Sequence, residues 1–234
     1  MQDYKFRDEN LGFLFDMYAK INIVDCICCH SKQFSKWASS GPYTAYKCNN
    51  CNLIFMNPQL NEDGLNDYYS NYIGKRRLNN KKKMEQRSEQ YILDTKLITS
   101  YLTIGDKLLD VGCNGGFFLD AFGNNYDRWG TELDHKAVEF AKETFPGFSE
   151  KIFPGTIHQA NFSEKFFDSV MMRGVIEHVL NPNDTIKEVY IYEIDCLFFL
   201  SLPILMHQWK LKLDQSFDML DLLILNCTLH DLEF

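Results

Sequence analysis

LLDVGCNGGFF, from Leu108 to Phe118, is the stretch of this sequence that decides the fold. A short apolar run ends in Asp110, a turn dense in glycine follows, and the apolar pattern resumes at Phe117. That order predicts a buried strand, a tight turn and the start of a helix. Glycine lets a backbone approach a ligand closely because it has no Cβ, and a helix N-terminus offers unpaired N–H groups. Such a turn typically holds a nucleotide-like cofactor.

An alternation of strands and helices continues beyond this turn. Apolar segments near 129–133, 152, 167–172 and 197–202 predict four more strands. Helices are expected between them, one capped by Asp134. We therefore expect an α/β fold with a doubly wound, mainly parallel sheet over residues 106–234.

The cysteines are concentrated near the start of the chain, where five of the eight lie within the first 51 residues. Two C-x2-C pairs, Cys26 with Cys29 and Cys48 with Cys51, are separated by eighteen residues. Two such turns facing each other complete a tetrahedral site of four sulfurs, which favours zinc. Cys28 or His30 could replace Cys29, although C-x-C is the less usual spacing. The alternative is four free cysteines in a small core.

These features divide the chain into three parts. Residues 1–72 are expected to form a small zinc-knuckle module, residues 73–105 a linker and a helix, and residues 106–234 a cofactor-binding domain. Basic residues gather between 75 and 87, where a solvated helix face is favoured over a nucleic-acid patch.

The net charge of −8 argues against a nucleic-acid partner, and no apolar run reaches the roughly 20 residues that cross a bilayer. No secretory leader is visible, so a cytoplasmic protein without a membrane partner is expected. The oligomeric state is left open.

Glu132 falls at the end of the second predicted strand of the sheet. Ligands of doubly wound sheets bind beyond the carboxyl ends of the strands, where an acid can accept hydrogen bonds from both hydroxyls of a ribose. The alternative is an exposed surface glutamate. The glycine spacing from Gly112 to Gly116 does not fit G-x-G-x-x-G, which disfavours a nicotinamide-dependent oxidoreductase. The spacing fits another pattern, which is an acid, then any one residue, then G-x-G-x-G. Asp110 is the acid, and Asn114 replaces the middle glycine.

From Cys26 to about Pro203 the chain resembles class I S-adenosylmethionine-dependent methyltransferases with an N-terminal zinc-binding segment. The resemblance rests on the paired knuckles and on YKCNNCNLIFMNPQL, LLDVGCNGGFF, WGTELD and FFDSVMMRGVIEHVLNP, in that order. It implies S-adenosylmethionine as the cofactor, with zinc in the N-terminal module. It also implies that the following residues contact the cofactor: Asp110, Gly112, Cys113, Asn114, Gly115, Gly116, Glu132, Leu133, Arg173 and Gly174.

The pair Glu177-His178 stands where such proteins often carry the same two residues. Because imidazole titrates near neutrality, His178 is the candidate catalytic base if the acceptor must lose a proton. A histidine that caps the start of a helix is the alternative.

The segment after Pro203 does not match the strand pair and helices that end this family's sheet, so we expect a C-terminally incomplete domain. Two functions are carried forward. The first is a methyltransferase acting on a small-molecule acceptor, such as a sugar or natural-product intermediate. The second is a catalytically weak or inactive zinc-binding scaffold protein.

Overall fold

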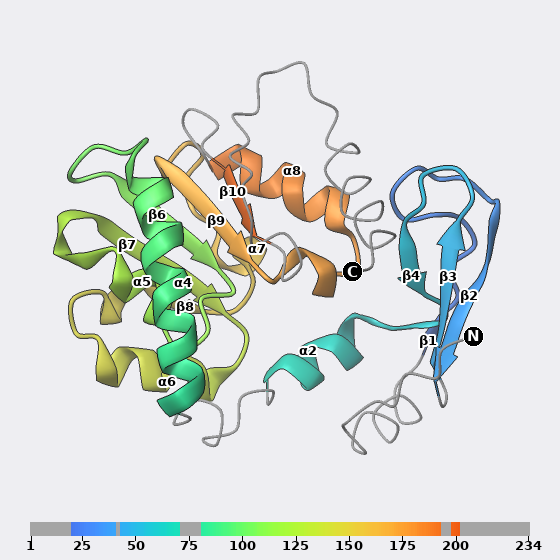
Figure 1. Ribbon diagram of the computed structural model, residues 1–234, viewed down its shortest axis with the longest axis horizontal. Helices are drawn as coiled ribbons and strands as arrows, with labels where there is room; N and C mark the ends of the chain where they lie inside the picture. The colour runs from blue at the N-terminus through green and yellow to red at the C-terminus, as the bar shows by residue number, and fades with distance from the viewer. Residues whose placement is uncertain (1–19, 41–42, 71–80, 193–197, 202–234) are drawn as a thin grey trace. The chain divides into compact units, whose positions relative to one another are not determined.

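The computed structural model describes residues 20–40, 43–70, 81–192 and 198–201 (Figure 1). The chain divides into two compact units. The first runs to Tyr68 and includes Leu180–Asn183, and the second begins at Tyr69 and resumes at Asp184. The part expected to follow Pro203 lies outside the described residues.

The first unit is built on short antiparallel strands. β2 (Phe34–Ser40), β3 (Tyr43–Cys48) and β4 (Ile54–Met56) form a sheet in that order, and β1 (Lys20–Ile21) pairs with β5 (Gln59–Leu60). The Phe34 ring packs edge-on against Tyr46 and Phe55, with centroid distances of 5.7 and 5.3 Å. These aromatic contacts fill a unit too small for a large apolar core. Helix α2 (Glu62–Ser70) follows β5.

The second unit contains the predicted parallel sheet. Its strands are β6 (Lys107–Val111), β7 (Asp127–Glu132), β8 (Ile152–Pro154), β9 (Ser169–Arg173) and β10 (Phe198–Ser201). All neighbouring pairs are parallel, in the order β10-β9-β6-β7-β8. The α/β sheet is therefore confirmed, although residues 197 and 202 of the predicted last strand lie outside the described residues.

Helices alternate with these strands. They are α4 (Lys81–Thr99), α5 (Phe117–Ala121), α6 (His135–Thr144), α7 (Ile157–Ala160) and α8 (Pro182–Tyr192). Three 3-10 turns, η1 (Gly123–Asn125), η2 (Ser149–Lys151) and η3 (Ile176–His178), join them. Asp134 caps α6 as predicted, because its carboxylate accepts the N–H groups of Lys136 at 2.9 Å and Ala137 at 3.4 Å.

Both faces of the sheet are covered. Leu108 and Met171 lie in an apolar cluster with Ile98 of α4, Phe118 and Leu119 of α5, and Val138 and Ala141 of α6. Helix α4 crosses this face in Figure 1. Leu109 and Val170, one residue along their strands, are also fully buried, so the opposite face is covered too. The chain moves across the sheet from β9 to β10 in the direction opposite to its path from β6 to β8. Because such crossovers are right-handed, α8 lies on this opposite face.

The strand order creates a switch point beside β6. The chain leaves β6 toward β7 and β8, then returns to β9 on the other side of β6. The loops after β6 and β9 therefore diverge, and this is where doubly wound sheets bind their ligands. Among the helices in the described parts of the chain, none has the length and apolar character that crossing a membrane requires.

Candidate functional site

The turn after β6 is folded back onto the neighbouring strand. The backbone N–H groups of Gly112 and Cys113 both donate to the carbonyl of Thr131 in β7, at 2.8 and 2.9 Å. Gly112 has φ +74°, and a Cβ built there would lie 2.5 Å from Cγ2 of Val175. Position 112 therefore requires glycine for both its backbone angle and its packing.

Asn114 takes a positive φ of 54°, as expected for an asparagine replacing glycine. Its backbone N–H donates to Oε2 of Glu132 at 2.8 Å. Oε1 of the same carboxylate accepts the N–H of Asp134 at 2.9 Å. Glu132 therefore lies directly beside the glycine turn. Burial raises the pKa of Glu132, while these N–H donors oppose the rise.

Asp110 is a buried acid at this end of the sheet. The residue is 3% exposed, and its Oδ1 has no hydrogen-bond partner among the described residues. Burial raises the pKa of Asp110 to about 8; Arg173 acts in the opposite direction and Glu132 adds to the rise. A buried carboxyl oxygen without a partner is costly, which makes it a candidate for contact with a ligand.

Cys113 turns its side chain away from this edge. The thiol is buried with Phe118 and Leu119, and its Sγ lies 2.6 Å from where a Cβ on Gly130 would be. Burial raises the pKa of Cys113, so its thiol is neutral at physiological pH. Only its backbone is placed to contact a cofactor.

The remaining predicted positions follow the strand ends. Gly115 and Gly116 complete the turn, and Leu133 follows Glu132 at the end of β7. Arg173 ends β9 and Gly174 follows it with φ +67°. Helix α5 has only five residues, too few for the dipole effect expected from a longer helix.

His178 lies in η3, beyond the carboxyl end of β9. Its side chain is exposed, and its ring centroid is 5.7 Å from that of Tyr69. It is thus on the same edge of the sheet as the glycine turn. Its role as a base stays a prediction.

The four predicted metal ligands come together in the first unit. The sulfurs of Cys26, Cys29, Cys48 and Cys51 all lie within 4.8 Å of one another, with 3.5 Å between Cys26 and Cys51 and 3.6 Å between Cys29 and Cys48. A tetrahedral zinc ion with Zn–S bonds of about 2.3 Å separates its sulfurs by about 3.8 Å. The donor set and its spacing therefore fit zinc.

The two knuckles share one backbone design. The N–H of His30 donates to the carbonyl of Cys26 at 2.9 Å, and the N–H of Asn52 donates to that of Cys48 at 3.0 Å. Both donors have positive φ, 57° and 62°. His30 is exposed and closes a turn, whereas Cys28 is buried outside the group of four. The geometry therefore agrees with Cys29 as the metal ligand in place of Cys28 or His30.

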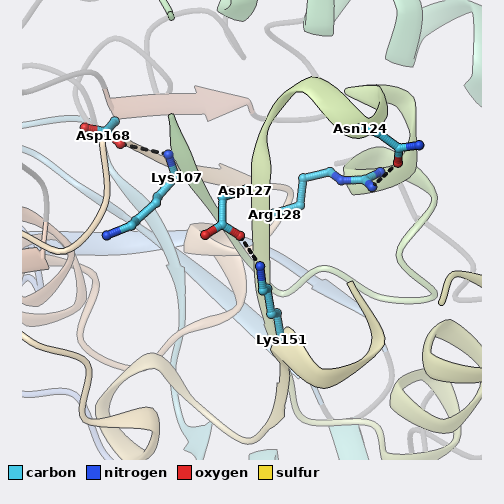
Figure 2. A network of polar contacts seen from close by, with 6 residues as sticks. All are labelled: Lys107, Asn124, Asp127, Arg128, Lys151 and Asp168. Carbon is cyan, nitrogen blue, oxygen red and sulfur yellow. Dashed lines mark hydrogen bonds and ion pairs between the residues drawn. The ribbon is translucent and has the colours of Figure 1, made fainter. Parts of the chain in front are cut away.

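A hollow of about 490 Å³ lies at the opposite, amino-terminal edge of the sheet, lined in part by Asn124, Arg128, Gly147 and Lys151. Figure 2 shows its polar contacts: Arg128 Nη2 donates to Asn124 Oδ1 at 2.8 Å, and Lys151 pairs with Asp127 at 2.5 Å. The Lys151–Asp127 pair joins the starts of β7 and β8, and the Arg128–Asn124 hydrogen bond joins β7 to the turn η1. Because ligands of such sheets bind at the carboxyl edge, we assign this network to stability.

Sequence reasoning missed one group of residues near the site. Asp94 in α4 is buried and forms an ion pair with Arg173 at 3.0 Å. The available signal was a lone acid among apolar neighbours, Ile92, Leu93, Leu97 and Ile98. That local pattern does not predict that Asp94 pairs with Arg173, which lies 79 residues later in the chain.

The comparisons with known proteins agree with this arrangement. Residues 109–191 match the family model described as a methyltransferase domain, and these residues include β6 to α8 almost completely. Residues 109–191 are thus similar to a methyltransferase domain, and the order of the parallel strands matches the class I methyltransferase fold. None of the curated proteins matches the chain.

Solved structures offer distant similarities. A Methanococcus maripaludis protein, provisionally described as an S-adenosylmethionine-dependent methyltransferase, is 13% identical with a TM-score of 0.43, over 51% of this chain and 62% of that one. YcgJ from Bacillus subtilis is 21% identical with a TM-score of 0.42, over 48% and 49%. A Thiobacillus denitrificans methyltransferase solved with S-adenosylhomocysteine is 18% identical with a TM-score of 0.37, over 45% and 44%. The chain thus spans less than two thirds of each structure.

Proposed function

We propose that this protein is an S-adenosylmethionine-dependent methyltransferase that transfers a methyl group to a small-molecule acceptor. The observation that carries the proposal is the placement of two acids, the buried Asp110 and the half-buried Glu132, at the ends of β6 and β7, with the glycine turn beside them. This group lies at the switch point of the sheet, where this fold binds nucleotide-like ligands.

The residues present fit the cofactor. Oδ1 of Asp110, which has no hydrogen-bond partner in the described part of the chain, offers an acceptor for the ammonium group of the amino-acid part. Each carboxylate oxygen of Glu132 accepts one N–H and has a second lone pair for a ribose hydroxyl. The backbone from Gly112 to Gly116 permits close approach, because three of its five residues lack a Cβ.

S-adenosylmethionine supplies a methyl group that the positive charge on sulfur already activates. The chain's own contribution is to bind and orient the acceptor in line with that group. If the acceptor is a hydroxyl or an acidic carbon, His178 would take its proton on a ring nitrogen. Its exposed position after β9 supports this role.

The acceptor class and the metal belong to the same proposal. A sugar or natural-product intermediate as the acceptor is supported only by the resemblance in sequence motifs. Zinc bound by Cys26, Cys29, Cys48 and Cys51 would fix the two turns of the first unit, a structural role. The net charge of −8 supports a protein without a nucleic-acid partner, and we propose that it acts in the cytoplasm.

Calorimetric titration with S-adenosylmethionine, S-adenosylhomocysteine and NAD, beside a radiolabelled-methyl assay on small acceptors, tests the proposal. We expect the first two to bind with micromolar to sub-millimolar constants, about −5 to −8 kcal/mol, and NAD not to bind. His178→Ala should reduce any methyl transfer while leaving binding unchanged. Binding without any methyl transfer would support the scaffold alternative. If neither S-adenosylmethionine nor S-adenosylhomocysteine binds, the proposal is overturned.

A further inference from the structure

The four sulfurs of the proposed zinc site differ in how easily solvent reaches them. Cys29 is only partly buried, whereas the other three ligands are 4% exposed or less. Those three, Cys26, Cys48 and Cys51, lie with Phe55 in the buried apolar cluster of the first unit, and Cys29 packs at its margin. A dissolved reagent therefore meets Cys29 first, because oxidation of cysteine follows exposure of the sulfur.

A hydrogen bond marks the open side of Cys29. The side-chain amide of Asn50, an exposed residue in the turn of the second knuckle, donates to Sγ of Cys29 at 3.5 Å. His30, the next residue along the chain, is exposed as well. The Cys29 sulfur thus lies beside polar groups that solvent reaches. A thiol that binds a metal is held as a thiolate at neutral pH, and the thiolate is the nucleophilic form of cysteine.

The sulfurs form two close pairs, and each pair joins one knuckle to the other. Sγ of Cys29 lies 3.6 Å from Sγ of Cys48, and Sγ of Cys26 lies 3.5 Å from Sγ of Cys51. All four are free thiols in the structure. A disulfide has an S–S bond of about 2.05 Å, so each pair is short of bonding distance by a change that rotation of the side chains can supply.

We propose that Cys29 is a site of oxidation by hydroperoxides and that Cys48 resolves it. The thiolate sulfur of Cys29 attacks one peroxide oxygen, the O–O bond breaks, and hydroxide or alkoxide leaves, so that Cys29 becomes a sulfenic acid. The thiolate of Cys48 attacks that sulfur and displaces hydroxide, which forms the Cys29–Cys48 disulfide. Two thiolates are thereby oxidised, and one peroxide is reduced.

The first disulfide removes two of the four zinc ligands, and the two thiolates that remain do not retain the metal. Cys26 and Cys51 are then free to form the second disulfide with another peroxide. Both disulfides join the same two knuckles that zinc would join, so the oxidised unit keeps its turns together without the metal. The inference rests on the zinc site of the proposed function.

The test uses the whole chain, loaded with zinc, and hydrogen peroxide. A chromogenic chelator follows the metal, and the products are alkylated and mapped by tandem mass spectrometry. We expect about one zinc to be released per chain as about two equivalents of peroxide are consumed. The species with one disulfide should contain Cys29–Cys48, with Cys26 and Cys51 alkylated. Dimedone present during oxidation should label Cys29 before the other three ligands, because dimedone traps sulfenic acid.

Cys28→Ser is the matched control. Cys28 lies in the same knuckle as Cys29 and is buried, but it is outside the group of four sulfurs. This variant should release its zinc at the wild-type rate and form the same disulfides. A thiol reductant with added zinc should return both proteins to the metal-bound form, since a disulfide and a sulfenic acid are reversible states of cysteine.

The two levels of the inference fail differently. If the purified protein holds no zinc, the metal part of the proposed function is wrong, and the mapped disulfides still decide the roles of Cys29 and Cys48. If zinc is present but peroxide neither releases it nor forms a disulfide, the oxidation site is wrong. A first disulfide within one knuckle or to Cys28 would overturn the pairing, and first labelling of a buried ligand would overturn the role of Cys29. These readings on wild type need no variant to fold.

Discussion

The carboxylate of Glu132 accepts the backbone N–H of Asn114 at 2.8 Å, so the end of β7 is joined directly to the glycine turn after β6. A single side chain thereby supports the shape of the turn and presents its remaining lone pairs toward the edge where the cofactor is proposed to bind.

Glu132→Ala should weaken the binding of S-adenosylhomocysteine by about 1.5–3 kcal/mol, the usual range for losing charge-assisted hydrogen bonds. Isothermal titration calorimetry measures the change. Glu139→Ala, on the exposed face of α6, is the control and should bind as wild type does. Equal affinities for wild type and Glu132→Ala would remove Glu132 from the site.

Gly112→Ala should destabilise the protein more than Gly123→Ala. Both glycines have similar positive φ, +74° and +70°, so the backbone cost of about 1–2 kcal/mol is shared. A Cβ at 112 meets Val175 Cγ2 at 2.5 Å, whereas a Cβ at 123 has no atom within 4 Å. Overpacking adds about 1–3 kcal/mol, measurable as a difference in the free energy of unfolding from urea titration.

Val175→Ala provides the second half of this comparison. In that background the extra cost of Gly112→Ala over Gly123→Ala should shrink, because the clashing methyl group is gone. An unchanged difference would show that packing against Val175 is not the reason for glycine at 112.

Purified protein should contain about one equivalent of zinc, and Cys48→Ser should lose it, because three thiolates hold the ion far less tightly than four. Elemental analysis of the dialysed protein measures the content. Cys28→Ser is the matched control: Cys28 is buried but lies outside the group of four sulfurs, so this variant should keep its metal. Full zinc content in Cys48→Ser would contradict the assignment.

Asp110→Asn should gain stability relative to wild type as the pH rises from about 5 to about 8. The pKa of Asp110 is raised from 3.8 to about 8 by burial, so in this window folded wild type keeps a proton that the unfolded chain has lost. Unfolding then releases a proton, and wild type loses up to about 1.4 kcal/mol per pH unit that the amide variant does not lose.

Urea titrations at pH 5, 6.5 and 8 would compare the two proteins, and the difference between their free energies of unfolding should widen at each step. Parallel pH profiles would mean that Asp110 is ionised in the folded protein throughout this range.

Much of the fold could be predicted from the sequence because its signals are local. The spacing of Cys26, Cys29, Cys48 and Cys51 fixes two turns that each need only five residues. The cap at Asp134 and the positive φ of Asn114 likewise depend on their immediate neighbours. Apolar runs between turn residues gave the five strands of the sheet.

The rest depends on contacts between distant residues. The pairing of Asp94 with Arg173 joins a helix to a strand 79 positions later, and no periodicity in either segment encodes it. The direction of the Cys113 thiol could not be predicted either, because the turn interrupts the alternation that assigns side chains to faces in a strand.

The contact between Cys113 and Gly130 limits the order in which this sequence can change during evolution. With the sulfur 2.6 Å from where a Cβ on Gly130 would lie, even alanine at position 130 is blocked while cysteine occupies 113. A lineage that first shortens residue 113 would ease this clash, whereas one that first enlarges residue 130 would pass through a destabilised protein. The effects of substitutions at the two positions, one in the turn and one in the neighbouring strand, are therefore expected to be coupled.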